Sequence, residues 1–257
     1  MSHDLDWFVL IDALAFASVA LRMSFGGLFR AYPAVFIHAI YESALAFVVL
    51  AVPFTKSSYG YFYDSITPLR WILWIAVVVS LYRQTLGQYG ALVTIARRVL
   101  IAGLVATGLF VAFTLHLDLS NWAPSSWILT TLLAIDRALA TALALLVLSL
   151  CAFLAWFVIP TRRNCAYLCV GLGIGFACRA ATSLIRNAGG QQINHTINLI
   201  AIVLSVAVYF ALAAMLNPSG EHQTSFVVRR PSPREVEAAI SKLGALTGHL
   251  PGKIRVQ

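Results

Sequence analysis

The chain has 257 residues, of which 60% are hydrophobic and only 11% are charged, and its mean hydropathy is +0.83. A soluble domain carries about 25% charged residues, so this composition excludes an ordinary soluble protein and indicates a polytopic membrane protein. The basic residues behind the net charge of +8 lie between apolar runs and in the C-terminal tail. That distribution is typical of topology signals, and no nucleic-acid partner is expected.

Seven stretches are candidates for spanning helices, since a membrane-crossing helix needs about 20 mostly apolar residues. In chain order they cover residues 7–25, 33–53, 68–84, 99–117, 126–159, 164–186 and 196–216. The expected fold class is therefore all-α, a bundle of seven transmembrane helices over residues 1–216. The acidic start MSHDLDW lacks the features of a cleavable signal peptide, so the first stretch is expected to remain in the fold.

Basic residues are divided unequally between the two sets of connections. One side receives Arg22, Arg30, Arg83, Arg97, Arg98, Arg162, Arg163 and the tail residues Arg229, Arg230, Arg234, Lys242, Lys253 and Arg255. The other side receives only Lys56 and Arg186. Because cytoplasmic loops carry the excess of Lys and Arg, this predicts an N-terminus outside and a C-terminus in the cytoplasm.

Aromatic residues gather where the outer membrane boundary is expected. They are Trp7, Tyr59, Tyr61, Tyr63, Trp71, Trp122 and Trp127. Tyrosine and tryptophan are enriched at membrane–water interfaces, so these residues support the same orientation.

Residues 217–257 are expected to form a basic cytoplasmic tail. Within it, SPREVEAAISKLGALTG predicts a short helix, since Ser232 and Glu235 form a capping box and apolar residues recur near one face after them. Such a helix can lie on the anionic inner leaflet or bind a cytoplasmic or membrane protein partner. The sequence leaves both alternatives open.

Six charged residues lie inside the expected spans, where a charge at a helix centre costs about 2.5–3.5 kcal/mol. They are Asp12, Glu42, Arg70, Asp136, Arg137 and Arg179. A rise of about 1.5 Å per residue places all six in the outer half of the membrane, Arg70 only a few ångströms deep. Adjacent helical residues point about 100° apart, so Asp136 and Arg137 are expected to pair with other helices. The candidates are Arg179 or Arg70 for Asp136, and Glu42 or Asp12 for Arg137.

Polar residues on the last two spans extend this pattern. Asn194, Asn198, Ser205 and Tyr209 form one stripe, and Arg179, Thr182 and Arg186 share another face. On the same span as Arg179, Gly171 and Gly175 have the GxxxG spacing that lets helices approach closely.

These charges suggest a ligand site in the outer leaflet. The candidate residues are Glu42, Arg70, Asp136, Arg137, Arg179 and Asn198. Intramembrane charges often mark functional sites, so a small extracytoplasmic ligand is expected there. The alternative is that the same groups only hold the helices together.

No motif for catalysis or metal binding is apparent. A nucleophile elbow, HExxH and a P-loop are all missing, so no enzyme activity, catalytic residue or cofactor is expected. Cys151, Cys165, Cys169 and Cys178 all lie in spans and are expected to be free thiols rather than metal ligands. His116 and His195 lie near outer span ends, and whether they hold a heme stays open. No lysine lies in a span, which excludes a retinal Schiff base.

Several strings resemble an uncharacterised family of seven-helix bacterial membrane proteins that is numerous in acidobacterial genomes. They are FRAYPAVFIHAIYESA, YGYFYD, SLYRQTLGQYGAL and IDRALATALALL, and the likeness extends over roughly residues 20–217. The resemblance implies a seven-helix protein of the bacterial cytoplasmic (inner) membrane. It implies no activity, because the family has no established one.

Together these observations favour a non-enzymatic, receptor-like or scaffold module. An outer polar site would bind a small ligand, and the basic tail would meet a partner at the opposite end. The alternatives are a transporter or ion permease, and a non-catalytic subunit of a larger membrane complex. A transporter predicts a continuous polar path, but the inner halves of the fourth and fifth stretches hold almost no polar groups.

Overall fold

The computed structural model describes residues 3–53, 56–86, 127–156, 161–189 and 194–222, with a few single positions between 98 and 109. Every element in these ranges is helical: α1 (His3–Phe25), η1 (Leu28–Arg30), α2 (Pro33–Ala51), α3 (Lys56–Leu86), α5 (Trp127–Trp156), α6 (Arg163–Gly189), α7 (Asn194–Met215) and η3 (Pro218–Glu221). The expected fourth span, at 99–117, and the expected helix after Ser232 fall outside the described residues.

Five of these helices are long and apolar enough to cross a membrane, which is what the composition predicted for a multi-pass membrane protein. The qualifying segments are Trp7–Phe25, Pro33–Ala51, Gly60–Leu86, Ala134–Ala155 and Arg163–Thr182, and α7 contains a shorter apolar part, Leu199–Met215. Large apolar side chains such as Leu14, Ile40, Leu145 and Val203 lie exposed on the outward faces. An apolar exterior around an apolar interior is the arrangement that a lipid environment favours.

Helix α3 begins much earlier than the sequence predicted. Pro68 was expected at its first turn, where proline is tolerated, but it lies inside a helix that starts at Lys56. Hydrogen bonds from Thr67 Oγ1 to the carbonyl of Tyr63 (2.7 Å) and from Ser65 Oγ to that of Tyr61 (2.8 Å) accompany the turn that leads to the proline. At about 1.5 Å per residue, Arg70 is about 21 Å from the start of its helix rather than a few ångströms.

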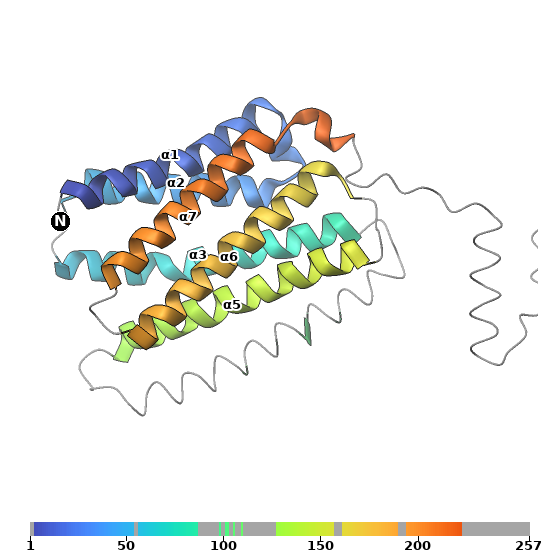
Figure 1. Cartoon of the computed structure of the whole chain (residues 1–257). Helices are drawn as coiled ribbons and strands as arrows, with labels where there is room; N and C mark the ends of the chain where they lie inside the picture. The colour runs from blue at the N-terminus through green and yellow to red at the C-terminus, as the bar shows by residue number, and fades with distance from the viewer. Residues whose placement is uncertain are drawn as a thin grey trace, which may run out of the picture.

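The described helices form a closed ring (Figure 1). Going round it, α1 packs against α2, α2 against α3, α3 against α5, α5 against α6, α6 against α7, and α7 against α1. Helices that follow one another among the described residues are therefore also neighbours in space. The start of α1 lies at the same end of the ring as the starts of α3, α5 and α7.

A solid apolar layer fills the ring in the half that lies away from the start of α1. Each helix of the ring contributes apolar residues to this layer, and they lie about two helical turns along the helix from its polar residues. Its fully buried members include Val19, Met23, Val77, Leu81, Leu143, Val147, Leu168 and Leu216. Protein interiors are packed as densely as organic crystals, so this layer separates the polar interior from that end of the bundle.

Beyond the apolar layer, polar contacts tie the chain after α7 to the neighbouring helices. Arg22 Nε donates to the carbonyl of Leu216 at 2.7 Å. Asn164 Nδ2 donates to the carbonyl of Asn217 at 2.7 Å and to Glu221 Oε1 at 2.9 Å. These bonds hold the segment that leads toward the C-terminal tail against α1 and α6.

Candidate functional site

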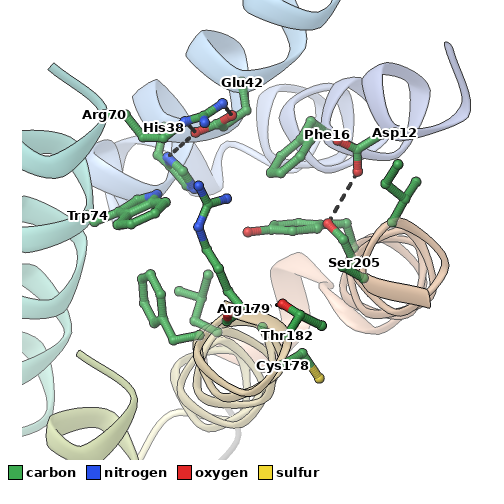
Figure 2. Close-up of a pocket in the computed structure, with 16 residues that line it drawn as sticks. Asp12, Phe16, His38, Glu42, Arg70, Trp74, Cys178, Arg179, Thr182 and Ser205 are labelled. Carbon is green, nitrogen blue, oxygen red and sulfur yellow. Dashed lines mark hydrogen bonds and ion pairs between the residues drawn. The ribbon is translucent and has the colours of Figure 1, made fainter. Parts of the chain in front are cut away.

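A polar cavity lies inside the helix ring, in the half that contains the start of α1. Its volume is about 190 Å³, and it is lined from α1, α2, α3, α6 and α7. The polar side chains that line it are Asp12, His38, Glu42, Arg70, Arg179, Thr182, Ser205 and Tyr209. Aromatic rings complete the wall, and Cys178 and Gly175 also line it (Figure 2). We call this space the polar cavity.

The strongest interaction in the polar cavity joins α2 to α3. Arg70 Nε donates to Glu42 Oε1 at 2.7 Å, and Arg70 Nη2 donates to Glu42 Oε2 at 2.6 Å. The two side chains are only 13% and 9% exposed. A two-pronged arginine–carboxylate pair of this kind has both charge and geometry matched, and it offsets the cost of holding each charge away from water.

A second ion pair joins α5 to α6. Arg179 Nη2 lies 3.2 Å from Asp136 Oδ2, and Trp71 Nε1 donates to Asp136 Oδ1 at 3.1 Å. The Arg179 guanidinium also lies 4.5 Å from the centre of the Trp74 ring, within range of a cation–π interaction. Asp136, which does not line the polar cavity, therefore holds the Arg179 guanidinium in place at the cavity wall. Trp71, which the sequence analysis placed at the membrane boundary, is half-buried and donates this hydrogen bond within the bundle.

A third polar contact joins α1 to α7 without a basic partner. Ser205 Oγ donates to Asp12 Oδ1 at 3.2 Å (Figure 2). Among the described residues, no lysine, arginine or histidine lies in ion-pair range of this carboxylate. Asp12 thus differs from Glu42 and Asp136, each of which has an arginine beside it.

Two nitrogen atoms of the lining side chains have no hydrogen-bond partner. They are Nδ1 of His38 and Nε of Arg179. His38 is only 3% exposed, and its Nδ1 lies 4.0 Å from Glu42 Oε1, too far for a hydrogen bond. Buried polar atoms nearly always have a partner, so these two atoms are available to a bound molecule.

The structure brings most of the predicted site residues together. Glu42, Arg70 and Arg179 line the polar cavity, and Asp136 contacts Arg179 from behind it. Asp136 is paired with Arg179, one of its two predicted partners. The other predicted partner, Arg70, forms its ion pair with Glu42. Arg137 is half-buried and does not line the cavity. The side chain of Asn198 lies outside the described residues, and so do those of Asn194, Arg186 and both histidines considered for heme.

Several residues of the cavity wall were not among the predicted site residues. His38 is one of them, although it is one helical turn from Glu42, a spacing that could have revealed it. Trp74 follows Arg70 at the same spacing. The stripe on the last span was informative, since Ser205 and Tyr209 both line the polar cavity.

No metal site is formed by the part of the chain that the structure describes, since no three histidine, cysteine or acidic side chains come together there. All four cysteines are free, as predicted, and Cys165 and Cys169 are buried. Comparisons with protein-family models, curated proteins and solved structures find no match in any of the three. The interpretation of the polar cavity therefore depends on its geometry.

Proposed function

We propose that this chain is a receptor-like integral membrane module whose polar cavity binds a small ligand, without enzyme activity. The single observation that carries the proposal is a 190 Å³ cavity lined by charged side chains and closed on one side by a solid apolar layer. Ligand sites are concave and combine apolar walls with a few placed polar groups. The alternative, in which these groups only hold the helices together, does not require such a space.

The proposed topology is seven transmembrane helices in the cytoplasmic membrane of a bacterium, with the N-terminus outside and residues 217–257 in the cytoplasm. The fourth helix is placed at 99–117. The polar cavity then opens in the outer leaflet, and the contacts around Asn164 and Glu221 lie at the cytoplasmic face. The unequal distribution of basic residues supports this orientation, and the sequence resemblance to acidobacterial seven-helix proteins supports the number of spans and the membrane.

The topology predicts opposite behaviour of reporters at the two ends. Green fluorescent protein fused after Gln257 is expected to fluoresce in a bacterial host, and alkaline phosphatase fused at the same place is expected to be inactive. The same pair inserted in the connection between α2 and α3 should give the reverse result. Fluorescence at both places, or at neither, contradicts an odd number of spans with the N-terminus outside.

The proposed function predicts that filling the polar cavity abolishes ligand binding. A ligand at a hundred times its Kd stabilises the folded state by about 2.7 kcal/mol. A panel of small amines, amino acids, carboxylates and polyols should therefore contain solutes that raise the unfolding midpoint of the purified protein. Gly175 has nothing within 4 Å of an added Cβ and lines the cavity, so Gly175→Leu is expected to remove this stabilisation.

Gly60→Leu is the matched control, because Gly60 also has open space around an added Cβ and lies outside the polar cavity. This variant should keep the full response to the same solutes. Equal loss in both variants would show that the effect is not specific to the cavity. No response from the parent protein to any solute in the panel would contradict the proposal.

A transporter or ion permease is the second candidate, and it is favoured by the charges that line the cavity. Transport needs a path to both faces, whereas the layer around Leu81, Leu143 and Leu168 is fully buried apolar side chains. Protein reconstituted in liposomes is therefore expected to bind a stabilising solute without accumulating it. Uptake above protein-free liposomes would favour transport.

A non-catalytic subunit of a larger complex is the third candidate. It predicts that the polar cavity has no ligand and that a second protein covers an apolar flank of the helix ring. The basic tail is proposed to meet either the anionic inner leaflet or that protein partner. Co-purification of one defined protein, together with no response in the solute panel, would favour this alternative.

A further inference from the structure

One carboxylate of the polar cavity has no basic side chain beside it. Glu42 is matched by Arg70, and Asp136 is matched by Arg179. Asp12 is the third carboxylate, and it has no basic partner among the described residues. The Asp12 carboxylate is therefore the acidic group of the cavity that no described side chain pairs, and electrostatic interactions are stronger in a partly enclosed site than in water.

Protonation of His38 does not supply the missing positive charge. His38 is 3% exposed, and its Nδ1 makes no hydrogen bond. A protonated imidazole carries a proton on both ring nitrogens, and burying such a charged donor without a partner is costly. The neutral imidazole is the form that this environment favours. Asp12 is only half-buried and has the Ser205 hydroxyl as a donor, so the cost of its charge is smaller, and His38 does not pair it.

The surroundings of Asp12 suit a positively charged group. Phe16 follows Asp12 by one helical turn, and Tyr209 follows Ser205 by one turn on the facing helix. The Phe16 and Tyr209 rings pack with centroids 4.0 Å apart and both line the polar cavity. A carboxylate beside aromatic rings attracts ammonium groups through both charge and cation–π interactions.

A second recognition point lies on the other side of the polar cavity. Arg179 Nε is a donor without an acceptor, although the same guanidinium is held in place by Asp136 and the Trp74 ring. An oxygen atom of a ligand would satisfy this donor. Since the liquid volume per water is about 30 Å³, the 190 Å³ cavity has room for roughly six water-sized groups.

We propose that the ligand is a small amine that also carries a hydrogen-bonding oxygen. Its ammonium group binds Asp12 and Ser205 beside Phe16, and its oxygen accepts from Arg179 Nε. This proposal rests on the proposed function, and it adds the chemical class of the ligand. It predicts that the polar cavity selects cations over anions of the same size.

Cys178 is a native reporter at the edge of the polar cavity, because the residue forms part of the cavity wall while its sulfur points away from the cavity centre (Figure 2). In the purified wild-type protein in lipid nanodiscs, modification of Cys178 is measured by mass spectrometry with three methanethiosulfonates. The aminoethyl reagent is cationic, the sulfonatoethyl reagent is anionic and the methyl reagent is neutral. Each rate is divided by the rate of the same reagent with free 2-mercaptoethanol, and the neutral reagent corrects for access.

The corrected rate for the cationic reagent is expected to exceed that for the anionic reagent by about tenfold or more. A negative charge in a cleft raises the local concentration of cations by this order of magnitude. Asp12→Asn should bring the two rates close together. Asp64→Asn is the matched control, since Asp64 is another half-buried acid that does not line the cavity. It should keep the preference.

A protection experiment needs no variant. Ethanolamine at millimolar concentration is expected to slow modification of Cys178 by the neutral methyl reagent. Ethylene glycol and glycolate, which are similar in size but neutral and anionic, are expected to have little effect. Equal protection by all three solutes overturns the proposal.

The outcomes separate the two proposals. A preference for the anionic reagent, or protection by glycolate alone, overturns the amine ligand and leaves a ligand-binding cavity in which Arg179 dominates. An unchanged cationic preference in Asp12→Asn overturns the role of Asp12. No response of the parent protein to any solute in the stabilisation panel, in contrast, overturns the proposed function itself.

Discussion

Arg70→Met is expected to cost about 3–5 kcal/mol of unfolding free energy, the usual result of removing one partner of a buried ion pair. The variant keeps most of the apolar stem but leaves the Glu42 carboxylate, 9% exposed, with no arginine beside it. Its other neighbour, His38, lies 4.0 Å away and makes no hydrogen bond to it. The measurement is an unfolding titration of the protein in mixed detergent and lipid.

The double variant Glu42→Gln/Arg70→Met is expected to recover a large part of this loss, because it leaves no unpaired charge inside the bundle. Arg162→Met is the matched control. Arg162 also pairs with a glutamate, Glu221, at 3.0 Å, but its side chain is 54% exposed. Exposed pairs contribute about 0–1 kcal/mol, so a loss in Arg162→Met as large as that in Arg70→Met would contradict the argument.

Gly171→Ala is expected to destabilise the bundle by about 1–3 kcal/mol, as overpacking of a tight contact does. A Cβ at Gly171 would lie 2.7–2.9 Å from three side-chain atoms of Leu212 on α7. Leu212 is 3% exposed, so its side chain has little room to withdraw. Leu212→Ala in the same chain should relieve the clash, and the double variant should lose less than the two single losses added together.

Gly175→Ala tests the other glycine of the same GxxxG spacing. Nothing lies within 4 Å of an added Cβ there, because the position faces the polar cavity. Alanine is the better helix former by about 1 kcal/mol, so this variant is expected to be as stable as the parent or slightly more stable. Equal destabilisation at both glycines would mean that α6 approaches its neighbour along the whole motif, contrary to the structure.

The GxxxG motif shows which helix contacts a sequence pattern can predict and which it cannot. Spacing predicted that both glycines serve close helix contact, but only Gly171 does so, while Gly175 leaves space for the cavity and Gly173 contacts Val147 on α5. All three lie on one helix whose turn and rise are regular. Which helix each one faces depends on how α6 is rotated within the ring, and spacing carries no information about that rotation.

The ion pairs were also predictable only in part from the sequence. The balance of acidic and basic residues predicted that the charges would meet, since burying six unpaired charges is too costly. Asp136 and Arg179 do meet. Arg70 lies farther from the start of its helix than predicted, because the helix begins at Lys56 and not at Pro68. Its partner Glu42 follows from the packing of α2 against α3.

By itself, the sequence determined that this protein is helical, that its helices are long and apolar enough for a membrane, and that its buried charges need partners. Those properties follow from the hydropathy of continuous stretches and from the cost of an unpaired charge, and both act locally. The tertiary structure decided the order of helices in the ring, the choice of partner for each charge, and the cavity that Asp12 shares with Arg179. These depend on contacts between residues far apart in the chain, where packing selects one arrangement among several that satisfy the same pattern.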